Sequence, residues 1–106
     1  MKKTLTLSLL LIFSINSFSQ SKEDCLSNLS IFAEYAKVKN YDAAYEPWLE
    51  VKSQCPKLNI AIYVYGERLL KSFIKKSEGN KRDEYQEDLL DLYDEWLKHF
   101  SKSKSG

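Results

Sequence analysis

Seven carboxylates crowd the segment between residues 82 and 100, and they are the first candidates for chemistry in this chain. They are Asp83, Glu84, Glu87, Asp88, Asp91, Asp94 and Glu95. Spacings of three and four residues place several of them on one face of a helix. Paired carboxylates can transfer protons or bind calcium, but no calcium-binding loop or glycine turn accompanies these. We therefore interpret the cluster as a solvated helix face and predict no metal site and no cofactor.

The other charged residues give no sign of catalysis. The single histidine, His99, has no nucleophile motif near it, so we expect it at the surface and predict no catalytic residue. With 16 Lys and Arg against 15 Asp and Glu, the chain lacks the basic excess of a general nucleic-acid binder. A local basic cluster suits the end of a helix, where the helix dipole favours cations; it comprises Lys71, Lys75, Lys76, Lys81 and Arg82.

The two cysteines, Cys25 and Cys55, are better explained by structure than by chemistry. The chain has no CxxC motif, and His99 is too distant in sequence to complete a metal site. Cys25 opens one predicted helix and Cys55 ends the next, and these two ends meet in an antiparallel hairpin. We therefore predict a Cys25–Cys55 disulfide. It would close a loop of about 31 residues and contribute roughly 3.7 kcal/mol to stability.

The N-terminus has the pattern of a signal peptide over residues 1–19. A basic start, MKK, precedes the apolar run TLTLSLLLIFSIN and the small residues Ser17 and Ser19. We expect cleavage before Gln20, export to the periplasm or cell envelope, and no membrane span after removal of the leader. An uncleaved N-terminal anchor is the alternative. A lipidated Cys25 is disfavoured by the charged residues before it. Export also suits the disulfide, which needs an oxidising compartment.

The elements that position these residues are predicted to be four helices, at about 24–38, 42–54, 58–76 and 82–100. Each carries apolar residues at spacings of three and four. Residues 20–24 are expected to be flexible, Lys39–Asn40 to form a turn, 77–80 a loop and 101–106 a disordered tail. The predicted fold is all-α, with two antiparallel hairpins at about 25–55 and 57–100.

Pro47 lies inside the second predicted helix, where it removes a backbone hydrogen bond toward Ala43. We expect a slight bend near the helix start. A functional kink that shapes a groove is the alternative.

Five residues of the stretch 41–56 resemble the second helix of a tetratricopeptide repeat. The aromatic, small, bulky, small-or-apolar and proline positions of that helix are occupied in order by Tyr41, Ala44, Trp48, Val51 and Pro56. The proline suits a helix end because the residue before it is driven out of the α region.

The second hairpin carries the same resemblance with more departures. Gly66 matches the small residue of a first helix. Tyr93 and Trp96 repeat the spacing of Trp48 and Val51. The third loop is longer than in the family, Leu89 replaces an alanine, and Ser101 stands at the closing proline. The resemblance implies two stacked repeats, an α-α superhelix, whose concave face is built from the first and third helices.

The leader together with YDAAYEPW also resembles exported repeat proteins of the Bacteroidota. This implies a non-enzymatic protein–protein interaction or scaffold module. We expect a protein or peptide to contact Tyr35, Tyr63 and Glu67 on the concave face. A small secreted helical inhibitor, or another envelope binding protein, is the alternative.

Two repeats are few for a stable stack. We expect the last helix to leave an apolar side partly uncovered around Leu92, Trp96 and Phe100. Either self-association or a longer array, of which this chain is the N-terminal part, would cover it.

Overall fold

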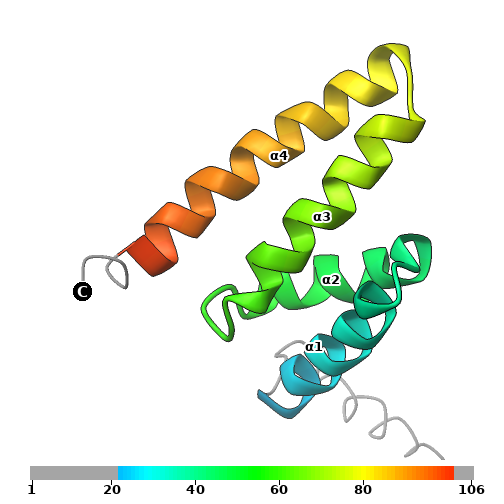
Figure 1. The fold of residues 1–106 in the computed structure, drawn as a ribbon. Coiled ribbons are helices and arrows are strands. Elements are labelled where there is room, and N and C mark those ends of the chain that lie inside the picture. The colour runs from blue at the N-terminus through cyan, green and yellow to red at the C-terminus, as the bar shows by residue number, and fades with distance from the viewer. Residues whose placement is uncertain (1–21, 102–106) are drawn as a thin grey trace, which may run out of the picture.

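A computed structural model describes residues 22–101, which fold into four α-helices without a strand. They are α1 (Lys22–Lys37), α2 (Tyr41–Gln54), α3 (Ala61–Lys76) and α4 (Gly79–Phe100). Helix α1 pairs with α2 and α3 with α4 (Figure 1), which confirms the all-α fold of two hairpins. The predicted signal peptide, residues 20–21 and the tail 102–106 lie outside the described residues.

The helix boundaries differ from the prediction in five places. Helix α1 begins at Lys22, so residues 22–24, expected to be flexible, form its first turn. It ends at Lys37, one residue early. The N-cap of α2 is Asn40 rather than Asp42, because the Asn40 side chain accepts a hydrogen bond from Ala43 N at 3.3 Å. Helix α3 begins at Ala61 rather than 58, since Asn59 Oδ1 accepts from Ala61 N at 2.8 Å and holds a turn there.

The fifth difference is the third loop, which is shorter than predicted. Only Ser77 and Glu78 separate α3 from α4, because Gly79 starts the last helix with a φ of 62°. A positive φ is readily adopted by glycine, which has no Cβ to clash with the backbone. Helix α4 therefore has 22 residues against 16 in α3.

The two hairpins meet where Trp48 of α2 lies on Gly66 of α3. The Trp48 side chain is 2% exposed, and its Nε1 donates to the Ile62 carbonyl at 2.8 Å. A Cβ built on Gly66 would come within 2.7 Å of the indole. Gly66 is therefore required for the indole to reach the α3 backbone. Ala44 and Val51, on the same face of α2, are fully buried.

Helix α3 is the central element, because it packs against α1, α2 and α4. Six of its residues are buried, whereas α4 buries only Leu92 among the described residues. Leu92 is 1% exposed, so the expectation that it would be partly uncovered is wrong. The exposed leucines of α4 are Leu90 and Leu97, each 63% exposed.

The predicted disulfide is present between Cys25 and Cys55, with their Cα atoms 6.3 Å apart. It joins the first turn of α1 to the C-cap of α2. Pro47 lies within α2, and the helix continues through it to Gln54. Within residues 22–101, no helix is both long enough and apolar enough to cross a membrane.

Candidate functional site

The residues predicted to bind a partner are not brought together. Tyr63 is fully buried, so its predicted contact with a partner is wrong. Its ring packs near Trp96 and Phe100 at centroid distances of 6.1 and 5.6 Å, and its hydroxyl donates to the Pro56 carbonyl at 2.8 Å. Burial, and then the charge of Glu95, raise the pKa of Tyr63 to about 12. Tyr63 is thus a core residue that joins α3, α4 and the α2–α3 turn.

Glu67 and Tyr35 lie on different helices, α3 and α1. One Glu67 carboxylate oxygen accepts a hydrogen bond from the Tyr93 hydroxyl at 2.6 Å and lies 3.4 Å from Lys71 Nζ. The hydrogen bond from Tyr93, with help from Lys71, lowers the pKa of Glu67. Tyr35 is 40% exposed on α1. Glu67 therefore holds α4 to α3, and only Tyr35 keeps an exposed surface of the expected kind.

A different cavity, of about 320 Å³, lies between α2 and α4, and we call it the α2–α4 groove. Its α2 side is mostly aromatic and aliphatic, and its α4 side is acidic. The lining residues are Tyr45, Trp48, Leu49 and Lys52 from α2, and Asp88, Asp91 and Glu95 from α4. Each set recurs at spacings of three and four residues, so it occupies one side of its helix.

The two sides of the groove touch at one end through Lys52. Its Nζ lies 3.6 Å from Glu95 Oε1 and 5.4 Å from the centroid of the Trp48 ring. Partial burial and the neighbouring Asp91 raise the pKa of Asp88 above its ordinary value, although Lys52 opposes this. The carboxylates therefore repel one another, and a further cation in the groove would relieve that repulsion.

The groove continues past Tyr45 toward the α3–α4 loop. A second hollow of about 330 Å³ shares Tyr45, and it is also lined by Asp42, Phe73, Lys76, Ser77 and Tyr85. The Tyr45 ring lies 6.0 Å from Trp48 and 5.4 Å from Phe73 between centroids, so it is held between the two hollows. Burial and the charge of Asp88 raise the pKa of Tyr45. The two hollows therefore adjoin at Tyr45.

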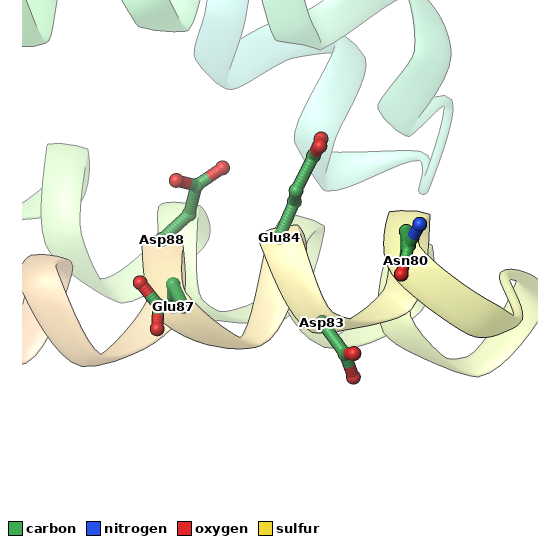
Figure 2. A pocket seen from close by; sticks show the side chains of 5 residues that line it. All are labelled: Asn80, Asp83, Glu84, Glu87 and Asp88. Carbon is green, nitrogen blue, oxygen red and sulfur yellow. The ribbon is translucent and has the colours of Figure 1, made fainter.

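The acidic residues at the start of α4 do not converge on a point. Figure 2 shows Glu84 and Asp88 rising from one side of the helix while Asp83 points away from them. Within residues 22–101, no group of three or more His, Cys, Asp or Glu side chains is placed to hold a metal ion. His99 is half-buried, with its ring 6.4 Å from that of Tyr63. The chemistry available in the groove is therefore binding through rings and charges.

Sequence reasoning missed the groove although its residues carried a signal. Tyr45 and Leu49 lie beside the packing face of α2, and the spacing of Asp88, Asp91 and Glu95 gives a second one-sided set. Neither pattern says that the two sets face each other, because that depends on the angle between the hairpins.

The repeat-packing residues occupy positions in and beside the core. Ala44, Trp48 and Val51 are buried, while Tyr41, Pro56, Tyr93 and Trp96 are half-buried. No family model matches the chain, and no curated protein or solved structure matches it either.

Proposed function

We propose that this chain is an exported, non-enzymatic protein–protein interaction module of tetratricopeptide-like type. In this proposal a segment of another protein binds in the α2–α4 groove. The single observation that carries the proposal is the groove itself, in which aromatic rings on α2 face carboxylates on α4. It replaces the concave face of the first and third helices as the expected binding surface.

The lining of the groove determines what kind of segment fits. Tyrosine gives a large contact area at a low cost in side-chain entropy and is enriched in protein interfaces, and Tyr45 is the partly exposed ring of this groove. An amphipathic helix can place apolar side chains against Tyr45 and Leu49. Lys or Arg on its flank would then meet Asp88 and Asp91. The partner segment is therefore apolar on one side and basic on the other.

Export is supported by the Cys25–Cys55 disulfide, because such bonds persist mainly in oxidising compartments. The signal peptide remains part of the proposal, and secretion of a reporter fused to residues 1–24 would test it. A reporter retained in the cytoplasm would contradict export.

The binding proposal is tested with a displayed library of random peptides panned against the oxidised protein. We expect enrichment of peptides that carry Lys or Arg beside apolar residues at helical spacing. The double variant Asp88→Asn/Asp91→Asn should lower the affinity for the selected peptides by roughly tenfold or more. Each charge pair contributes of order 1 kcal/mol to binding in a partly buried site.

The matched control is Asp83→Asn/Asp94→Asn, which makes the same change of net charge on the same helix. Asp83 and Asp94 are exposed and lie on another side of α4. The control should leave peptide affinity nearly unchanged. Equal loss in both double variants would mean that only net charge matters, and the absence of any enrichment would contradict the groove as a binding site.

A further inference from the structure

Lys52 fills one end of the α2–α4 groove with a positive charge of the protein's own. Its Nζ lies 3.6 Å from Glu95 Oε1, and its side chain is only 22% exposed. By contrast, the lysines of two ion pairs within single helices, Lys71 and Lys81, have side chains that are 60% and 62% exposed. The pair of Lys52 and Glu95 therefore differs from a solvated surface pair, because it joins two helices and is partly sheltered from water.

Trp48 helps to keep Lys52 at this end of the groove. Lys52 follows Trp48 by four residues, so both lie on the same side of α2, and its Nζ is 5.4 Å from the centroid of the indole ring. The attraction of a cation to the face of an aromatic ring adds to the attraction of Glu95. Lys52 is therefore a counter-ion that the groove carries in its own lining.

The carboxylates of the groove outnumber this counter-ion. Asp88, Asp91 and Glu95 line the groove at spacings of three and four residues along α4. Within residues 22–101, Lys52 pairs with Glu95, and no Lys or Arg lies within ion-pair distance of Asp88 or Asp91. Burial and then Asp91 raise the pKa of Asp88 in spite of the opposing charge of Lys52. The Asp88–Asp91 end of the groove thus keeps a negative charge, while the Lys52 end is already neutralised.

We propose that Lys52 determines which charge pattern the groove accepts, an inference that rests on the binding function proposed above. A bound segment places basic residues against Asp88 and Asp91, and it carries no basic residue at the end that Lys52 and Glu95 occupy. A cation at that end would have to displace Lys52 from Glu95 or lie beside its ammonium group, and like charges repel strongly where water is partly excluded.

The partner is therefore a segment with a basic half and an uncharged or acidic half. Repulsion from Lys52 rejects segments that are basic throughout, and such repulsion contributes to specificity as much as attraction does. Glu95 follows Asp91 by four residues, which is about 6 Å along the axis of α4. In a helical partner, the position that excludes a basic residue therefore lies about one turn beyond the basic pair.

The experiment is a lysine scan of a peptide selected from the displayed library against the oxidised wild type. Each position outside the basic pair is replaced by lysine in turn. Affinity is then measured for the wild type and for Lys52→Met, which keeps a long apolar side chain beside Trp48 but removes the charge. We expect one position, about one turn beyond the basic pair, where lysine weakens binding to the wild type by about 2- to 5-fold and strengthens binding to Lys52→Met by a similar factor.

The matched control is Lys37→Met, which makes the same change of net charge at an exposed lysine of α1, a helix that does not line the groove. Its scan should match that of the wild type. A second variant, Glu95→Gln, keeps Lys52 and removes its carboxylate partner, so lysine at the same peptide position should remain unfavourable. This variant keeps the test decisive if circular dichroism shows that Lys52→Met has lost helicity.

The outcomes separate this inference from the binding function. A scan with the same sign at every position in the wild type and in Lys52→Met overturns the inference and leaves the binding function standing. A reversal of sign in Lys37→Met, or a favourable lysine in Glu95→Gln, also overturns it, because net charge or Glu95 alone would then account for the result. If no peptide is selected, or the selected peptides lack basic residues, the binding function fails and the inference falls with it.

Discussion

The two hairpins of this fold are held together in different ways. The first is closed by a disulfide between the start of α1 and the end of α2, and five of its apolar residues besides Cys25 are buried: Phe32, Ala36, Ala44, Trp48 and Val51. The second lacks a covalent link, and the α4 backbone packs closely only against α3 among the described helices, while the Lys52–Glu95 ion pair joins it to α2. Helix α4 therefore has two sides that no other described helix covers, because it is held to the rest of the fold mainly through α3. The groove lies on one of those sides, and the exposed Leu90 and Leu97 lie on the other.

Removal of the disulfide should have the largest effect on the free energy of unfolding. Replacing both cysteines, as in Cys25→Ser/Cys55→Ser, should lower the free energy of unfolding by about 3–4 kcal/mol, because the unfolded chain regains the entropy of an open loop. Urea denaturation followed by circular dichroism measures this. The oxidised wild type with added reductant should approach the variant, and equal midpoints for all three proteins would show that the first hairpin does not need its covalent link.

Disruption of the contact between Trp48 and Gly66 should have the second largest effect on stability. Gly66→Ala places a methyl group where the indole lies and should destabilise the protein by about 1–3 kcal/mol. In a Trp48→Ala background, the same change should instead stabilise by about 0.5–1 kcal/mol, because alanine is a better helix former than glycine. Denaturation of the four proteins measures the cycle. An effect of the same sign in both backgrounds would contradict the close approach of α2 to α3.

Tyr63 connects the hairpins, and its effect should depend on pH. Tyr63→Phe should cost about 1 kcal/mol at neutral pH, since the bond to the Pro56 carbonyl is lost. The folded pKa of about 12 exceeds the ordinary 10.0. The neutral phenol therefore stabilises the fold fully below pH 10, and this contribution is lost as the pH rises through the folded pKa.

The stability of the wild type should accordingly fall more steeply than that of Tyr63→Phe above pH 10. Denaturation of both proteins at several pH values gives the two slopes. Parallel slopes would mean that Tyr63 is not buried in solution.

The smallest effect should be found within the second hairpin, at Tyr93. Tyr93→Phe should cost about 1 kcal/mol or less at neutral pH, since the bond to Glu67 is only partly buried. The folded pKa of Glu67 is lowered from 4.5, so this stabilisation is present above that value and is lost as the pH falls through the folded pKa. Thermal melts at neutral and acidic pH test this. A difference between the proteins that grows on acidification would contradict the assigned bond.

The sequence predicted those features that depend on local pattern. Periodicity gave the four helices, and the placement of Cys25 and Cys55 at helix ends gave their disulfide. The capping contacts of Asn40 and Asn59 and the early start at Gly79 were missed, because such contacts compete with helix propensity residue by residue.

The binding surfaces depend on the packing of one hairpin on the other, which no local pattern contains. Tyr63 was expected at a binding surface, but it is buried against Trp96 and Phe100, because the C-terminal end of α4 packs on the N-terminal end of α3. Asp88 and Asp91 were correctly placed on a helix face, whereas their position opposite Tyr45 and Leu49 followed only from the structure. The tetratricopeptide resemblance remains a proposal carried by residues 41–56.

The disulfide also determines how the chain would carry mechanical load. A pull applied at both ends passes directly from Cys25 to Cys55, so the segment 26–54 between them bears no tension. Up to about 100 Å of chain is thereby withheld from extension. The second hairpin lies in the line of force and would unravel first, so stretching would dismantle the groove while α1 and α2 stayed paired.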